Sequence, residues 1–219
     1  MIQTLTVLQL ILIIAVIFYM TANIIYLVRL QPVVKPISNP PRLSVCVPAR
    51  NEARGIQACL QSLLNQDYPN FEVIAIDDHS TDSTGDIMRT LSQENAHLKV
   101  LKAADLPEDW LGKPFALHQA FKIAQGEYLL FTDADPVFKP TAINTAVHVM
   151  RERELDVLTL MPQAEFGSFW ERAVQPVIFG FIASLTRFRN VNNPGHKSAM
   201  GFGAFLMFRR AAYEKIGGH

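Results

Sequence analysis

Short apolar runs alternate with helical patterns between residues 43 and 160, and this alternation constrains the fold more than any other feature. A glycine-rich run over residues 201–208 also looks like a buried strand. The other strand-like runs lie at 43–47, 71–76, 98–101, 128–132 and 155–160. Between them, apolar residues recur at helical spacing, as in Ile56 to Leu64 and in Phe115 to Gln125. Strands that alternate with helices form a mostly parallel sheet with helices on both faces. The sequence therefore predicts a Rossmann-like α/β fold.

A stretch without any charge, from Leu5 to Val28, precedes this region. As a helix it would reach about 36 Å, enough to cross the hydrocarbon core of a bilayer. A cleaved signal peptide is the alternative, but no lysine or arginine precedes the run. The nearby positive charges, such as Arg29 and Lys35, follow it. The positive-inside rule then predicts a single-pass transmembrane anchor over residues 1–30 with the following domain in the cytoplasm.

The rest of the composition is that of an ordinary domain. The formal net charge of the 219 residues is zero, which argues against an electrostatic nucleic-acid binder. Cys46 and Cys59 both lie in apolar patterns, so we expect buried thiols in a reducing compartment, without a disulfide or a zinc site. Four prolines between Gln31 and Pro41 favour extended chain and predict a linker over residues 31–42.

Polar residues follow three of the predicted strands. Residues 48–52 (Pro-Ala-Arg-Asn-Glu) follow the first strand, Asp77 and Asp78 the second, and Asp133 and Asp135 a later one. Ligands of such sheets bind at the carboxyl ends of the strands, so the three clusters predict one site. An Asp-X-Asp triplet can hold Mg²⁺ or Mn²⁺, which prefer carboxylate oxygens and are completed by substrate phosphates. The same triplet is also common in solvated turns.

The other polar residues have structural alternatives too. Asn51 and Glu52 can cap a helix or face a nucleoside. Asp77 and Asp78 cannot both be buried and ionised cheaply, so at least one should meet solvent, a donor, or a ligand such as a uracil N–H or a ribose hydroxyl. Lys113, just before a predicted helix, can add positive charge beside phosphates or be solvated surface.

Together these motifs resemble the family 2 glycosyltransferases, which have the GT-A fold. The matching elements are Pro48–Glu52, Ile76–Asp82, Gly112–Lys113 with Ala116–Leu117, Gly126–Tyr128 and Thr132–Asp135. The resemblance implies a nucleotide-sugar donor, commonly a UDP-sugar, and transfer to an acceptor hydroxyl with inversion. It also implies Mn²⁺ or Mg²⁺ at Asp133 and Asp135. The donor-binding residues that it implies are Pro48, Ala49, Asn51, Glu52, Asp77, Asp78, Lys113 and Asp133.

A narrower similarity concerns the acceptor. The segment from Leu106 to Lys113 looks like the membrane-anchored branch that glycosylates lipids such as hopanoids, carotenoids or ceramide. A lipid or lipid-like acceptor at the cytoplasmic membrane face is therefore implied. The nucleotide-sugar-binding half is expected over residues 43–140 and the start of the acceptor half over 141–219. Its apolar helix, 173–185, is too short to span a bilayer and is either interfacial or buried.

The general base is the part of the family pattern that does not match. In these enzymes it is usually an aspartate beyond a segment like Ile216–His219, and a Gln-X-X-Arg-Trp element follows. We therefore expect the base beyond residue 219, in a longer enzyme of which this chain is a fragment. The alternative is a catalytically silent, membrane-tethered module that binds sugar nucleotides. A nucleotidyltransferase is disfavoured because no glycine-rich phosphate loop follows the first strand. His196, in a loop, is either a catalytic candidate or a surface histidine.

Overall fold

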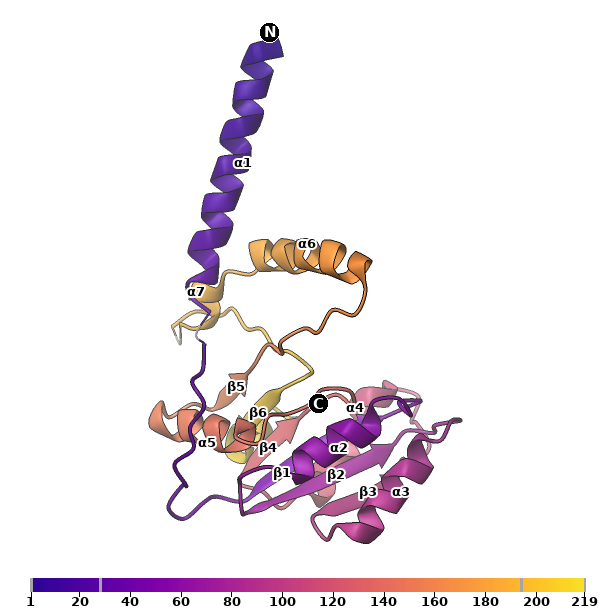
Figure 1. Ribbon diagram of the computed structural model, residues 1–219. Coiled ribbons are helices and arrows are strands. Elements are labelled where there is room, and N and C mark those ends of the chain that lie inside the picture. The colour runs from indigo at the N-terminus through magenta and orange to yellow at the C-terminus, as the bar shows by residue number, and fades with distance from the viewer. Residues whose placement is uncertain (1, 28, 194, 219) are drawn as a thin grey trace. The chain divides into compact units, whose positions relative to one another are not determined.

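The computed structural model describes residues 2–27, 29–193 and 195–218, and the chain divides into two compact units (Figure 1). One, here called the helical unit, comprises Met1–Leu30 and Gln163–Met200. The other, the sheet unit, comprises Gln31–Pro162 and Gly201–His219. Predictions that fall on Val28, Pro194 and His219 lie outside the described residues.

The described part of the sheet unit contains a six-stranded sheet in the order β3-β2-β1-β4-β6-β5. Its strands are β1 (Leu43–Ala49), β2 (Phe71–Asp77), β3 (Leu98–Lys102), β4 (Tyr128–Phe131), β5 (Val157–Thr159) and β6 (Leu206–Arg209). Strands β1 to β4 pair in parallel, β6 pairs antiparallel with β4, and β5 pairs antiparallel with β6. The predicted mostly parallel sheet is confirmed, with an antiparallel edge that the sequence did not indicate.

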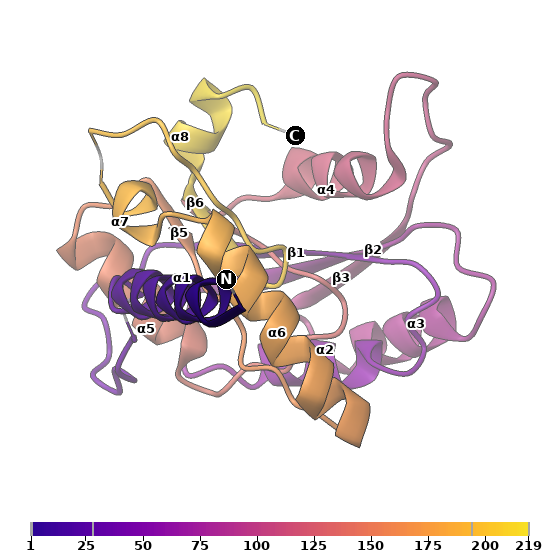
Figure 2. The same cartoon turned by 90° about the horizontal axis from the view of Figure 1, so that it is seen from above.

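Helices cover both faces of this sheet (Figure 2). The helices α2 (Ile56–Leu64), α3 (Thr84–Glu94) and α5 (Ala142–Glu152) pack on one face, and α4 (Gly112–Ile123) and α8 (Arg210–Lys215) pack on the other. Alternate side chains of a strand point to opposite faces, so Val45 and Val47 join the first core and Cys46 joins the second. Burial on both faces explains why β1, β2 and β4 are mainly apolar instead of alternating apolar and polar residues.

Several element boundaries differ from the predictions, and two of the differences concern residues discussed below. Helix α4 begins at Gly112 rather than Phe115, so Lys113 belongs to its first turn and Pro114 occupies a helix position that tolerates proline. The strand predicted over residues 201–208 is shorter, because Phe202 and Phe205 pair across a tight turn before β6 begins. In that turn the Phe205 N–H donates to the Phe202 carbonyl at 3.1 Å.

The helical unit comprises α1 (Ile2–Ile24), α6 (Phe169–Leu185) and α7 (Phe188–Val191). Asn23 joins these helices, since its amide donates to the Thr186 carbonyl and its Oδ1 accepts from the Phe188 N–H at 3.0 Å. Within α1, Thr6–Asn23 is long and apolar enough to cross a membrane. That finding rests on length and composition.

Helix α6 runs crosswise to α1 in both views of the helical unit (Figures 1 and 2). It starts four residues before the predicted 173, because Ser168 forms a capping box with Glu171. The Ser168 Oγ accepts from the Glu171 N–H at 3.2 Å, and the Glu171 carboxylate accepts from the Ser168 N–H at 3.0 Å. None of its described side chains is buried, and Phe169 and Trp170 are 75% and 72% exposed.

Candidate functional site

A pocket of about 300 Å³ opens at the carboxyl ends of β1, β2 and β4. Its lining residues are Pro48, Ala49, Arg50, Glu52, Asp78, Lys113, Asp133, Ala134 and Asp135. The strand register brings them together, because Ala49 pairs with Asp77 at the ends of β1 and β2. The loop residues that come directly after each strand then lie at the same edge of the sheet. The three clusters that the sequence placed at strand ends do converge there.

Asp133 and Asp135 lie in the loop that follows β4, and their carboxylates differ in their partners. The Asp133 carboxylate forms an ion pair with the Lys113 ammonium group. Asp135 is exposed, and its carboxylate makes no hydrogen bond or ion pair with the part of the chain that the structure describes. One carboxylate of the pair is thus neutralised by a lysine, while the other is open to a ligand.

The backbone of this loop is held from both sides. The Cys59 thiol donates to the Asp133 carbonyl at 3.7 Å, and the Thr132 hydroxyl donates to the Ala204 carbonyl at 2.8 Å. Burial, together with the charges of Asp135 and Asp133, raises the pKa of the Cys59 thiol to about 12, so the donor stays protonated. Burial also raises the pKa of Cys46. Both cysteines are free and buried, as predicted.

The two adjacent aspartates after β2 have different surroundings. Asp77 is buried, lies outside the pocket lining, and accepts a hydrogen bond from the Ser80 N–H at 3.1 Å. Asp78 lines the pocket, with its Oδ2 3.9 Å from the Arg50 guanidinium and its Oδ1 3.3 Å from His79 Nδ1. Asp78 is therefore the member of the pair that can meet a ligand, and Asp77 holds the loop.

Asn51 and Glu52 do not cap α2, which begins after Gly55 without a side-chain cap. Asn51 adopts a φ of 56° and accepts a hydrogen bond from the Thr81 N–H at 2.8 Å, outside the pocket lining. The Glu52 N–H donates to the Thr84 hydroxyl at 2.8 Å, and Glu52 lines the pocket. These bonds fasten the loop after β1 to the loop after β2 and to the first residue of α3.

Two lining residues were not among the predicted site residues. Arg50 belongs to the motif after β1, and its exposed side chain is the second cation of the pocket. Ala134 separates the two aspartates of the Asp-X-Asp triplet and lines the pocket with them. A basic residue beside carboxylates at a strand end was the available signal for Arg50.

His196 belongs to the helical unit, whereas the pocket belongs to the sheet unit. It is exposed, and its Nδ1 accepts a hydrogen bond from the Ser198 N–H at 3.1 Å. Its catalytic role stays a prediction. His118 and His148 are half-buried on α4 and α5; the first packs against the Trp110 ring and the second contacts the Lys35 carbonyl.

The charge and donor set of the pocket suit a divalent cation held together with phosphates. Four carboxylates and two cationic side chains line it, which leaves a formal charge of −2. No cluster of three metal-ligating side chains occurs among the described residues. Asp133 and Asp135 instead match a cation that takes one or two carboxylates and completes its coordination shell with water and substrate phosphates.

A mostly parallel sheet with a pocket at the carboxyl ends of its strands is the arrangement of ligand-binding α/β proteins. Residues 44–217 match the model of glycosyl transferase family 2, and the chain belongs to this family. The predicted family and its GT-A fold are therefore confirmed.

Two named relatives are similar in sequence to part of this chain. It is 31% identical over 116 residues to glycosyltransferase GlyG of Streptococcus pneumoniae, across 53% of this chain and 37% of that protein. It is 40% identical over 97 residues to beta-monoglucosyldiacylglycerol synthase of a Nostoc species, across 43% of this chain and 20% of that protein. The matched region thus spans well under half of either relative.

A solved structure shares the fold over nearly the whole chain. The mannosyltransferase PcManGT from Pyrobaculum calidifontis, in complex with GDP-Man and Mn²⁺, superposes with a TM-score of 0.66. The superposition covers 93% of this chain and 55% of that protein at 24% sequence identity. At this identity the likeness establishes the common architecture.

Proposed function

We propose that this chain is the donor-binding part of a membrane-anchored glycosyltransferase that moves a sugar from a nucleotide-sugar, a UDP-sugar, to a lipid acceptor at the cytoplasmic membrane face. The observation that carries the proposal is the pocket in which Asp133, Asp135 and Lys113 meet at the end of β4, within a family 2 chain. The metal, the acceptor and the membrane face are inferred from the points below.

Asp133 and Asp135 would hold Mn²⁺ or Mg²⁺ against the donor diphosphate. The solved mannosyltransferase of the same fold contains GDP-Man and Mn²⁺, which supports this assignment. The bound cation would neutralise charge on the leaving diphosphate as a Lewis acid. Lys113 lies in the first turn of α4 and would place its positive charge beside the phosphates, and the N-terminus of α4 would add its partial positive charge there.

The nucleoside would lie against the residues that follow β1 and β2. Asp78 and Glu52 line the pocket and can accept hydrogen bonds from base or ribose groups. Arg50, which faces Asp78 across the pocket, can bind a phosphate oxygen. Asn51 and Asp77, which the resemblance implies as donor-binding, would act by holding the two loops that carry these residues.

The acceptor hydroxyl would attack the anomeric carbon with inversion, and such a step needs a general base near that hydroxyl. The family resemblance leads us to expect this base beyond residue 219, with His196 as the alternative within the chain. A catalytically silent module that binds sugar nucleotides is the competing proposal. Turnover separates the two.

A lipid acceptor is proposed because the chain carries two apolar helices suited to a membrane. Thr6–Asn23 can span a bilayer, and α6 presents exposed apolar side chains in a helix of 17 residues, too short to span. Arg29 and Lys35 follow the span, which favours a cytoplasmic sheet unit. The name of the Nostoc relative, a glucosyldiacylglycerol synthase, agrees with a lipid acceptor.

The proposal is tested by measuring UDP and GDP affinity of the full chain in detergent by calorimetry, with Mn²⁺ and with a chelator. We expect Mn²⁺ to tighten UDP binding about 10-fold or more, equivalent to ~1.4 kcal/mol, and Asp135→Asn to remove that gain. Asp67→Asn, which changes an exposed carboxylate outside the pocket, is the control. Nucleotide affinity that is independent of Mn²⁺ in every variant would refute the metal assignment.

Turnover is measured with radiolabelled UDP-glucose and extracted membrane lipids. Transfer to lipid by a longer form of the enzyme supports the glycosyltransferase, and donor binding without any transfer supports the silent module. If the 219-residue chain itself transfers sugar at full rate, the base lies within it and our expectation is wrong.

A further inference from the structure

Glycines lie directly against three of the aspartates at the strand ends. A Cβ atom built on Gly85 would lie 2.4 Å from Asp77 Oδ2, and one on Gly112 would lie 2.9 Å from Asp78 Oδ2. A Cβ atom on Gly203 would lie 3.1 Å from both carboxylate oxygens of Asp133. Ordinary van der Waals contact begins near 3.4 Å, so no methyl group fits beside these carboxylates without a shift.

Backbone conformation does not explain these glycines. Among the described glycines, positive φ occurs at Gly217 and Gly218, not at Gly85, Gly112 or Gly203. Alanine could therefore adopt the backbone at the three positions. The feature that distinguishes them is the space that each leaves for a carboxylate.

Gly203 has the most direct relation to the proposed metal site. It lies in the turn before β6, and its Cβ position faces the Asp133 carboxylate, whose Oδ1 is also held by Lys113. Two hydrogen bonds hold this turn close to Asp133. The Ala204 carbonyl accepts from the Thr132 hydroxyl at 2.8 Å, and the Phe205 carbonyl accepts from the Leu160 N–H at 3.2 Å. An added methyl would therefore displace the carboxylate rather than the turn.

We propose that Gly203 is a positioning residue that sets the orientation of the Asp133 carboxylate for the divalent cation. The proposal rests on the proposed function, because it takes Asp133 as a metal ligand. Functional groups must stay within about 0.5 Å of the productive geometry, and metal–ligand distances vary by about 0.2 Å. To reach an ordinary contact distance from a methyl group at 3.1 Å, the Asp133 oxygens must move by a few tenths of an ångström. That movement is as large as the variation that metal–ligand distances allow.

The test compares Gly203→Ala with Gly201→Ala in the full chain. Gly201 is the matched control, because a Cβ atom there would meet the two Leu206 methyl groups at 3.5 and 3.7 Å, which are ordinary contacts. Mn²⁺ affinity in the presence of UDP is measured by electron paramagnetic resonance, and thermal unfolding by circular dichroism. We expect Gly203→Ala to weaken Mn²⁺ binding about 10-fold or more, the usual effect of losing a residue that orients a ligand, while Gly201→Ala binds as wild type.

Asp133→Asn and Asp135→Asn separate failure of this inference from failure of the proposed function. If both leave Mn²⁺ binding unchanged, the proposed metal site is wrong. If they abolish it while Gly203→Ala binds as wild type, the positioning role is wrong. If Gly203→Ala prevents folding, Asp133→Ala in the same chain should restore it by removing the carboxylate that the methyl group meets. Absence of that rescue also overturns the proposal.

Discussion

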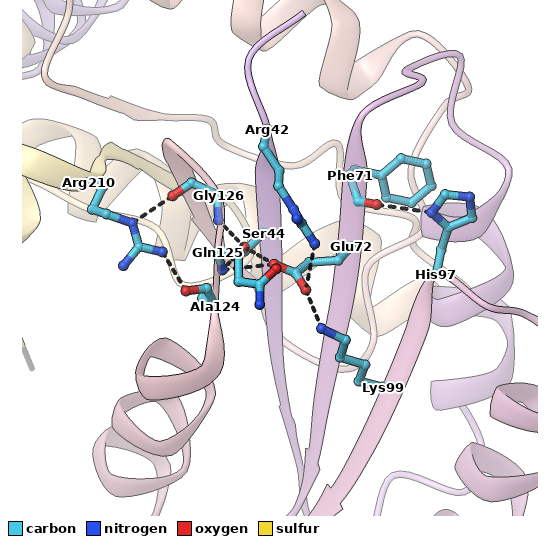
Figure 3. A network of polar contacts seen from close by, with 10 residues as sticks. All are labelled: Arg42, Ser44, Phe71, Glu72, His97, Lys99, Ala124, Gln125, Gly126 and Arg210. Carbon is cyan, nitrogen blue, oxygen red and sulfur yellow. Dashed lines mark hydrogen bonds and ion pairs between the residues drawn. The ribbon is translucent and has the colours of Figure 1, made fainter.

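Replacing Glu72 with alanine should destabilise the sheet unit strongly, because Glu72 is a buried charge at the end of the sheet opposite the pocket. It is 3% exposed. The Ser44 hydroxyl and the Gln125 N–H donate to its Oε1 at 2.7 and 2.8 Å, and the Lys99 ammonium donates to its Oε2 at 2.8 Å (Figure 3). Arg42 lies 3.5 Å from the same oxygen. The carboxylate thus joins β1, β2, β3 and the α4–β4 connection.

The cost follows from which partners would be left without an acceptor. Lys99 and Arg42 are 44% and 43% exposed and can return to water. The Gln125 N–H keeps the Ser44 Oγ as an acceptor at 3.1 Å, but the buried Ser44 hydroxyl loses its acceptor, and a stranded polar group costs about 1–3 kcal/mol. With the lost hydrogen bonds to the charged carboxylate added, we expect Glu72→Ala to lower the free energy of unfolding by about 2–4 kcal/mol. For a chain of this size the midpoint would fall by roughly 10 °C.

The assay is thermal and urea unfolding of the full chain in detergent, followed by far-ultraviolet circular dichroism. Glu127→Ala, which removes an exposed carboxylate beside the same connection, should change the free energy of unfolding by less than about 0.5 kcal/mol. A loss below about 1 kcal/mol for Glu72→Ala would show that water replaces the carboxylate. The interpretation of Glu72 as a buried structural charge would then be refuted.

Three further results are expected. Burial acts to raise the pKa of Glu72, but hydrogen bonds from Lys99, Ser44 and Gln125 outweigh it and hold the pKa below the usual value. The pKa of Glu72 is lower in the folded than in the unfolded chain. The stabilisation that the ionised carboxylate gives is therefore fully present above the unfolded pKa of about 4.3, and it is lost as the pH falls through the folded pKa. The unfolding free energies of wild type and Glu72→Gln, measured in urea against pH, should therefore converge in acid, and a constant difference would contradict the shift. Lys113→Met should weaken UDP binding about 10-fold in calorimetry, whereas Lys122→Met, elsewhere on α4, should not; equal affinities would remove Lys113 from the site. Cys46 and Cys59 should resist a thiol reagent at pH 8 until the chain unfolds, and labelling of the native chain would contradict their burial.

Much of the fold followed from local pattern. Strands β1, β2 and β4 are buried along their whole length because helices cover both faces, and their mainly apolar composition is visible in the sequence. Parallel strands bring their carboxyl ends to one edge, so the convergence of Asp78, Asp133 and Asp135 could be inferred before any contact was known.

The sequence by itself therefore determined the class of fold, the family and the edge of the sheet at which the pocket lies. The tertiary structure decided which member of Asp77 and Asp78 faces that pocket, and it placed Glu72 in a buried network rather than on a surface. It also paired β6 with β4 and so brought Gly203 against Asp133, 70 residues earlier in the chain. Local periodicity reports which face of an element is apolar, but the pairing of distant segments depends on packing free energy summed over the whole unit.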